Sequence, residues 1–297
     1  MTYVGRFAPS PTGPLHVGSL LTAVTSYLHA KRAGGEWLVR IEDIDPPRES
    51  PGAADDILRT LDAFDLHWDR SVLHQSTRHE AYEAAVADLL RRGLAFLCSC
   101  SRSAVRAANV AEGSRYPGTC RAQTRHDAAT AVRVRVDLGV QAFVDGVQGE
   151  IAADVAAVTG DYVVRRRDGL PAYHLAVVLD DAAQGVTAIV RGVDLLDSTG
   201  VHLHLQRALG LPAPAYWHTP VVVNAAGDKL SKQTGAAAVA GERASDTARR
   251  VLELLGARVP GELVGARPAR LWEWALARWR IETLRGIREL REPAGKS

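Results

Sequence analysis

The sequence predicts an α/β fold built on a parallel sheet, with a cysteine-containing insertion and a short helical region near its C-terminal end. Two strand-like segments, Val4–Ala8 and Glu36–Glu42, flank a segment with helical apolar spacing from His16 to about Arg32. A strand, a helix and a second strand in this order form a βαβ unit, whose strands pair in parallel. The cysteines, all within 98–120, and the helical pattern after residue 244 predict the other two regions.

The remaining elements follow from the same two periodicities. Helical spacing of apolar residues predicts further helices over 51–65, 77–93, 244–255 and 268–290. Alternating apolar residues over 132–138 and 141–147 predict a two-stranded ribbon. Val186–Val190 is an apolar strand with Arg191 at its C-terminal end, the edge at which open α/β sheets bind ligands. Residues 236–240 are expected to form a linker.

Composition narrows the class of protein. The chain has 297 residues and is 46% hydrophobic, which is enough for a sizeable core. It contains no run of eighteen apolar residues and no signal-peptide pattern, so we expect no membrane association and a cytoplasmic location. We also expect a monomer.

Charge is distributed unevenly along the chain. The formal net charge of +2 is too small to indicate nucleic acid by itself. Residues 98–135, however, carry seven arginines against two acids, and residues 236–297 carry twelve basic residues against eight acids. We expect both regions to contact an RNA phosphate backbone.

A proline-rich turn follows the first strand and leads into the first helix. His16 and Gly18 therefore lie at or just inside a helix N-terminus, where free N–H groups and the helix dipole favour phosphate. Gly18 lets a nucleotide approach the backbone, and His16 can donate a hydrogen bond to a phosphate oxygen. The alternative interpretation is an ordinary proline-rich loop before a helix.

A second motif, Asp228-Lys229-Leu230-Ser231-Lys232, lies more than two hundred residues later. Lys229 and Lys232 supply mobile positive charge, Ser231 adds a hydroxyl, and flanking glycines allow the loop to open and close. Taken alone it would be read as a solvated basic turn. Together, the two motifs predict a site for a nucleoside triphosphate from which pyrophosphate leaves.

The three cysteines have the spacing of a metal site. Cys98 and Cys100 are two residues apart, and Cys120 can return a third thiolate to them. An odd number of clustered cysteines argues against a disulfide framework, and zinc requires four ligands. The fourth ligand is left open between Tyr116, His126 and water, and three free thiols remain the alternative.

The two motifs, with Arg40-Ile41-Glu42-Asp43-Ile44-Asp45, resemble the glutamyl branch of the class I aminoacyl-tRNA synthetases over roughly residues 1 to 235. Three positions depart from that pattern: Ser19 stands for a frequent histidine, Gln233 for a serine, and Val177 for an asparagine. The last departure implies fewer contacts to the amino acid.

The resemblance implies a Rossmann-like catalytic domain in two halves, residues 1–95 and 185–235, with the insertion at 96–184 and helices at 236–297. It implies ATP with Mg²⁺ and L-glutamate as ligands. The ATP site would comprise His16, Gly18, Ser19, Lys229, Ser231 and Lys232, with His16, Lys229 and Lys232 catalytic. The glutamate site would comprise Arg6, Ala8, Ser10, Glu42, Tyr173 and Arg191.

Two features resemble one subgroup, the glutamyl-Q tRNA(Asp) synthetases. These are the pattern Cys-x-Cys…Tyr-x-x-x-Cys and the short stretch of about sixty-five residues after the lysine motif. The resemblance favours Tyr116 as the fourth zinc ligand and implies transfer of glutamate to queuosine in the anticodon of tRNA(Asp). The alternatives are a short glutamyl-tRNA synthetase that charges the tRNA 3′ end, a non-catalytic tRNA-binding paralogue, and a nucleotidylyltransferase.

Overall fold

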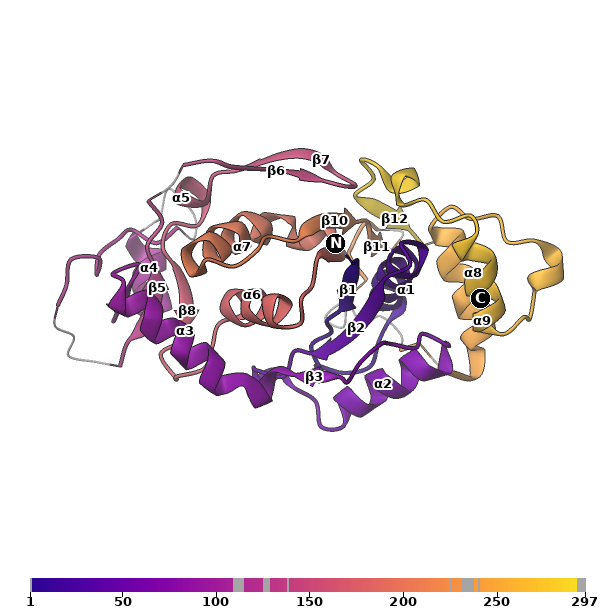
Figure 1. The fold of residues 1–297 in the computed structure, drawn as a ribbon, viewed down its shortest axis with the longest axis horizontal. Coiled ribbons are helices and arrows are strands. Elements are labelled where there is room, and N and C mark those ends of the chain that lie inside the picture. The colour runs from indigo at the N-terminus through magenta and orange to yellow at the C-terminus, as the bar shows by residue number, and fades with distance from the viewer. Residues whose placement is uncertain are drawn as a thin grey trace.

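Parallel strands form the centre of the molecule in the computed structural model, which describes residues 2–108, 115–124, 129–137, 139–224, 226–230, 238–239 and 241–292 (Figure 1). β1 (Val4–Phe7) and β2 (Glu36–Ile41) pair in parallel, with β3 (Leu73–His74) beyond β2. α1 (Val17–Arg32) joins β1 to β2, so the predicted βαβ unit is confirmed.

The second half of the sheet begins beside β1. β9 (Ala188–Gly192) pairs in parallel with β10 (Ala215–Thr219). The N–H of Thr187, just before β9, donates to the carbonyl of Val4 at 2.9 Å. The two motif-bearing halves of the chain thus meet at neighbouring strands, as the class of fold predicts.

Helices cover the sheet and link it to the C-terminal region. α1 buries Leu20, Leu21, Val24 and Leu28 against the same core that receives α2 (Ala53–Ala63), α8 (Ala244–Leu254) and α9 (Pro268–Leu276). Trp272 of α9 is buried, and its indole N–H donates to the carbonyl of Phe64 at 2.7 Å. The C-terminal region therefore packs as part of the main core.

The insertion contains its own three-stranded antiparallel sheet at the other end of the long axis (Figure 1). It comprises β4 (Ala95–Cys98), β5 (Ala131–Val134) and β8 (Tyr162–Arg165), in that order. The surrounding helices are α3 (His79–Arg91), α4 (Arg102–Ala108), α5 (Val155–Val158), α6 (Tyr173–Ala183) and α7 (Leu196–Leu209).

The predicted ribbon of 132–138 with 141–147 is wrong. β5 lies between β4 and β8, whereas β6 (Gln141–Asp145) forms a hairpin with β7 (Gly149–Ala153) and also pairs with β10. The alternation of apolar residues correctly predicted both strands, but it does not determine which strand each one pairs with. The turn at Gly149, whose φ is +81°, closes the β6–β7 hairpin instead.

The predicted helix over 268–290 is also too long. α9 ends at Leu276, a short 3-10 turn spans Ile281–Leu284, and β12 (Glu289–Arg291) pairs in parallel with β11 (Val221–Val223). Trp279, Ile281 and Leu284 bury their side chains in the main core without continuing the helix. The helix-like spacing of these apolar residues therefore reflects their burial in the core, without a continuous helix. The sequence also did not predict α7, β10 and β11.

Ala238 and Val239, in the predicted linker, lie against the first motif, where the Val239 N–H donates to the carbonyl of Leu15 at 2.9 Å.

Within the described ranges, the helices are all too short or too polar to cross a membrane.

We predict that Trp37→Ala lowers the free energy of unfolding by about 3–5 kcal/mol, since it removes a large side chain from the core. Trp37 is fully buried, stacks on Phe7, and donates its indole N–H to Ser26 at 2.9 Å. Urea denaturation measures the change. Trp274→Ala is the matched control, because Trp274 is only partly buried, and equal losses in the two variants would contradict the prediction.

Candidate active site and metal site

A cavity of about 590 Å³ opens where β1 and β9 end. It is lined by every predicted ATP- and glutamate-site residue that the structure describes: Arg6, Ala8, Ser10, His16, Gly18, Ser19, Glu42, Tyr173, Arg191 and Lys229. Ser231, Lys232 and Gln233 lie outside the described residues. Residues that are far apart in sequence thus form one chamber, as expected from the carboxyl ends of parallel strands.

His16 forms the N-cap of α1. Its Nδ1 accepts a hydrogen bond from the Ser19 N–H at 3.3 Å, and the Ser19 hydroxyl accepts one from the His16 N–H at 2.8 Å. A neutral imidazole whose Nδ1 accepts carries its proton on Nε2. A Cβ on Gly18 would lie 3.1 Å from the His16 ring, so this glycine lets the ring pack against the start of the helix. Ser19 thus has a capping role at the position where a histidine is frequent.

The start of the lysine loop reaches the same cavity. Lys229 forms an ion pair with Asp194, with 2.5 Å between Nζ and Oδ2. The Leu230 N–H donates to the carbonyl of Val222 in β11. Asp194 also lines the cavity, although the sequence analysis did not identify it. This carboxylate holds the first lysine of the loop at the cavity wall.

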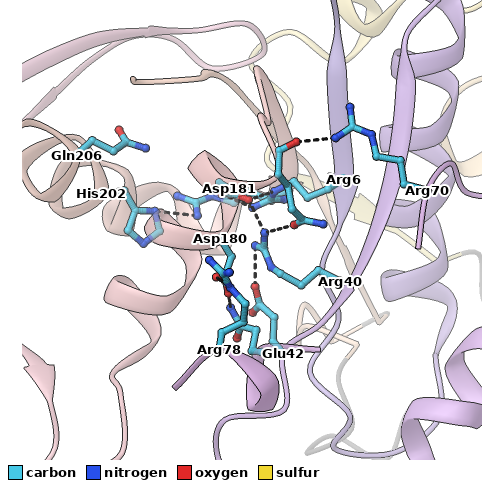
Figure 2. Close-up of polar contacts among 12 residues, drawn as sticks. Arg6, Arg40, Glu42, Arg70, Arg78, Asp180, Asp181, His202 and Gln206 are labelled. Carbon is cyan, nitrogen blue, oxygen red and sulfur yellow. Dashed lines mark hydrogen bonds and ion pairs between the residues drawn. The ribbon is translucent and has the colours of Figure 1, made fainter. Parts of the chain in front are cut away.

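A buried charge cluster lies beside the cavity (Figure 2). Arg6 donates to both oxygens of Asp181, at 3.0 and 3.3 Å, and Arg40 donates to Asp181 at 2.7 Å. Arg40 is fully buried and also binds Glu42 at 3.1 Å. This cluster joins β1, β2, the residue after β2, and α6.

The pKa values of the two carboxyls of the cluster, Asp181 and Glu42, shift in opposite directions. Burial raises the pKa of Asp181, but the two guanidinium groups of Arg40 and Arg6 outweigh it, and the net pKa is lowered. For Glu42, burial raises the pKa above its ordinary value, and Arg40 and Arg6 offset this only in part. Asp181 is thus held as an anion, and Glu42 is more readily protonated.

Neither Arg40 nor Asp181 was assigned a role from the sequence. Arg40 is part of the Arg-Ile-Glu-Asp segment, and Asp181 follows Asp180 inside a largely apolar helix. Two acids in a largely apolar helix could have indicated a buried ion pair from the sequence, because buried carboxylates are nearly always paired. Asp180 is likewise fully buried and binds Arg78, Tyr82 and Gln75. Val177 of the same helix is buried in the core.

Arg191 lies within β9, close to its end, and is 4% exposed. Its Nε donates to His218 Nε2 at 3.0 Å, and its Nη1 lies 3.2 Å from His202 Nδ1 (Figure 2 shows His202). Its Nη2 donates to the Thr199 hydroxyl at 2.7 Å. Asp145 of β6 accepts from the other ring nitrogen of His218 at 2.6 Å.

The three cysteines gather at one point of the insertion. The sulfur atoms of Cys98, Cys100 and Cys120 all lie within 4.8 Å of one another. The Tyr116 hydroxyl lies 3.4 Å from Cys98 Sγ and 3.9 Å from Cys100 Sγ, and it accepts the Cys120 N–H at 2.8 Å. His126, the other candidate, lies outside the described residues.

These four side chains suit a tetrahedral zinc ion. Zinc–sulfur bonds of about 2.3 Å place neighbouring ligands about 3.8 Å apart in a tetrahedron. The separations of 3.4 and 3.9 Å to Tyr116, and of 3.5 Å between Cys100 and Cys120, are close to that value. Burial raises the pKa of Cys120, but hydrogen bonds from Tyr116 and the Ser99 backbone outweigh it and lower the pKa to about 7, which favours the thiolate.

Some arginines around the cysteine cluster make contacts within the insertion, and others are exposed to solvent. Arg121 pairs with Asp161 at 2.7 Å, and Arg133 stacks on the ring of Tyr116 and donates to Cys98 Sγ at 3.3 Å. Arg102 and Arg106 of α4 are exposed. Arg121 and Arg133, which belong to the basic region expected to contact RNA, therefore make contacts within the insertion.

Comparison of folds defines the class of protein. The structure superposes on a glutamate-tRNA synthetase from Elizabethkingia anophelis with a TM-score of 0.82 at 24% identity, covering 99% of this chain and 68% of that one. A glutamate tRNA ligase from Elizabethkingia meningosepticum, in complex with its amino acid, gives 0.81 at 24% identity, covering 98% and 67%. The chain has the class I synthetase fold. The family described as the catalytic domain of class I tRNA synthetases (E and Q) matches residues 3–255.

Sequence relatives narrow the assignment. The glutamyl-Q tRNA(Asp) synthetase of Dechloromonas aromatica is 53% identical over 95% of both chains. Those of Chromobacterium violaceum and Pseudomonas aeruginosa are 52% and 50% identical, each over 94% of both chains. The chain belongs to the class I tRNA synthetases of the E and Q type, within the family of the glutamyl-Q tRNA(Asp) synthetases, and is an enzyme of the ligase class.

We predict that the purified protein retains about one zinc ion per chain and that Cys120→Ser loses it, because serine is a poor replacement for a thiolate ligand. Tyr116→Phe should weaken zinc retention at least tenfold while keeping the aromatic contact with Arg133. Competition with a colorimetric chelator measures both effects. If Tyr116→Phe retained zinc as tightly as the wild type, the fourth ligand would be another donor.

Proposed function

We propose that the enzyme activates L-glutamate with ATP in the absence of tRNA and then transfers the glutamate to queuosine in the anticodon of tRNA(Asp). The observation that carries this proposal is the single cavity. It joins a helix N-terminus and a lysine loop, suited to a nucleoside triphosphate, to two buried arginines and a buried carboxylate, suited to an amino acid with two carboxylates. The high identity to proteins named for this activity supports it.

The amino acid would bind at the arginine side of the cavity. Arg191 offers a guanidinium for the side-chain carboxylate, and Tyr173 adds a hydroxyl beside it. Glu42 and the charge cluster behind it lie where an ammonium group needs a negative partner. Arg6, Ala8 and Ser10 line the wall between this part and the first motif. The contacts orient the α-carboxylate for attack.

ATP would bind along the start of α1, with its phosphates at the helix N-terminus. One oxygen of the glutamate α-carboxylate attacks the α-phosphorus, the bond from that phosphorus to the bridging oxygen breaks, and pyrophosphate leaves. The Nε2–H of His16, with Lys229 and Lys232, stabilises the negative charge that develops on the phosphate oxygens, and Mg²⁺ enters with ATP. The protein positions reactants and neutralises charge.

In the second step, a hydroxyl of the cyclopentene diol of queuosine attacks the carbonyl carbon of glutamyl-adenylate. An ester forms, AMP leaves, and the hydroxyl proton departs with it or to solvent. Recognition of an anticodon loop suits arginines that are exposed at one end of the molecule, such as Arg102 and Arg106. Zinc, held by Cys98, Cys100, Cys120 and Tyr116, would keep this insertion in shape.

The test is transfer of radiolabelled glutamate, with ATP, to two tRNA pools. One pool comes from cells that make queuosine and the other from cells that cannot. Label confined to the queuosine-containing pool is the expected result. Equal label on both pools would indicate charging of the 3′ end, and an enzyme that supports neither transfer nor pyrophosphate exchange would be a non-catalytic paralogue.

We predict that kcat/KM for glutamate in ATP–pyrophosphate exchange falls as the pH drops through an apparent pKa above the ordinary value of a glutamate side chain. Burial raises the pKa of Glu42, and a protonated Glu42 cannot attract the substrate ammonium. The measurement is a pH profile over the range in which circular dichroism shows the protein folded.

Glu42→Gln provides the control for this profile. The substrate side chain itself titrates near 4.3, so the variant should retain only the limb that belongs to the substrate. Its kcat/KM at neutral pH should fall by roughly 10–100-fold, the loss of one hydrogen bond to a charged group. A variant profile identical in shape to that of the wild type would exclude Glu42 as the titrating group.

A further inference from the structure

Arg191 differs from the other buried arginines of the site in the charge of its partners. Arg6 and Arg40 both contact the carboxylate of Asp181. Among the described residues, no carboxylate lies within ion-pair distance of Arg191. Its guanidinium donates to His202, His218, the Thr199 hydroxyl and the Leu195 carbonyl, and it lies over the uncharged ring of Tyr216.

Hydrogen-bond geometry makes both histidines acceptors toward Arg191. A guanidinium only donates, so His218 Nε2 and His202 Nδ1 must accept from it at 3.0 and 3.2 Å. His218 then carries its proton on Nδ1 and donates it to Asp145 at 2.6 Å. His202 carries its proton on Nε2 and donates it to His174 at 3.1 Å. The chain Asp145–His218–Arg191–His202–His174 therefore has one consistent set of tautomers.

Both histidines are held in the neutral form. Burial, followed by the charge of Arg191, places the pKa of His202 well below its ordinary value. Burial also lowers the pKa of His218, and the hydrogen bond to Asp145 offsets this only in part. His202 and His218 are 1% and 0% exposed and do not line the cavity, whereas Arg191 does. They act on a ligand only through Arg191.

We propose that His202 and His218 are positioning residues that hold Arg191 by uncharged acceptors, so that no protein carboxylate contacts its guanidinium and the guanidinium selects an anionic amino acid side chain. This inference rests on the proposed function, since it concerns the amino acid that enters the same cavity. Asp145, the carboxylate in this chain of contacts, is separated from Arg191 by the neutral ring of His218. A carboxylate side chain would form a direct ion pair with the guanidinium. A neutral amide of the same shape would leave the buried guanidinium without one, which is unfavourable. The pair thus favours glutamate over glutamine.

The test compares two isosteric substitutions, His202→Asn and His202→Asp. Asparagine keeps an uncharged oxygen close to the position of Nδ1, whereas aspartate places a negative charge there and forms the ion pair that the wild type avoids. ATP–pyrophosphate exchange is measured with glutamate and with glutamine. We expect His202→Asn to keep the KM for glutamate within about threefold. We expect His202→Asp to raise it at least tenfold, with kcat changed less than threefold and the preference for glutamate over glutamine reduced at least fivefold.

A merely structural role for His202 predicts a different result. The two variants would then share the same KM for glutamate, or kcat would fall as much as KM rises, and either outcome would overturn the inference. Thermal unfolding establishes that both variants fold. If His202→Asp does not fold, Thr199→Asp and Thr199→Asn make the same comparison on Nη2 of Arg191. Wild-type enzyme without glutamate-dependent exchange would instead refute the proposed function.

Discussion

The carboxylate of Asp181, buried between the guanidinium groups of Arg6 and Arg40, is the contact on which the cavity depends. It joins the first strand, the second strand and α6 at one point, and Arg40 extends the cluster to Glu42. Removing one member would leave the others as uncompensated buried charges, which costs about 3–5 kcal/mol. The same side chains therefore stabilise the junction between the first two parallel strands and α6, and Arg6 and Glu42 line the cavity.

The site uses its two cavity-lining arginines in different ways. Arg6 forms a direct ion pair with Asp181, a carboxylate that it shares with Arg40. Arg191 has only uncharged partners, so it retains its charge for a ligand. The cavity therefore contains one guanidinium that contacts a carboxylate and one that does not. In the proposed function, this difference would favour one orientation of an amino acid that carries two carboxylates.

Two structures at opposite ends of the molecule support this cavity. The C-terminal helices pack into the main core, where Trp272 binds the carbonyl of Phe64. At the far end of the insertion the three cysteines gather beside Tyr116, whose ring is covered by Arg133. The β6–β7 hairpin then connects the insertion to the sheet through β10, and Asp145 of β6 orients His218 behind Arg191. The insertion thus contacts the residues that hold Arg191.

The sequence by itself determined the βαβ unit, the helices over 53–63 and 79–91, the two motifs that meet at the cavity and the cysteine cluster, because periodicity and unusual local residues carry that information. It also indicated which residues would line the cavity, since motif residues at the carboxyl ends of parallel strands converge on one edge. Only the tertiary structure decided that β6 pairs with β7 and β10, that α9 stops at Leu276, and that Asp181, His202 and His218 hold the site's arginines. Arg6 and Asp181 are 175 residues apart in the chain, and whether a buried acid is an ion-pair partner depends on distances that no local pattern specifies.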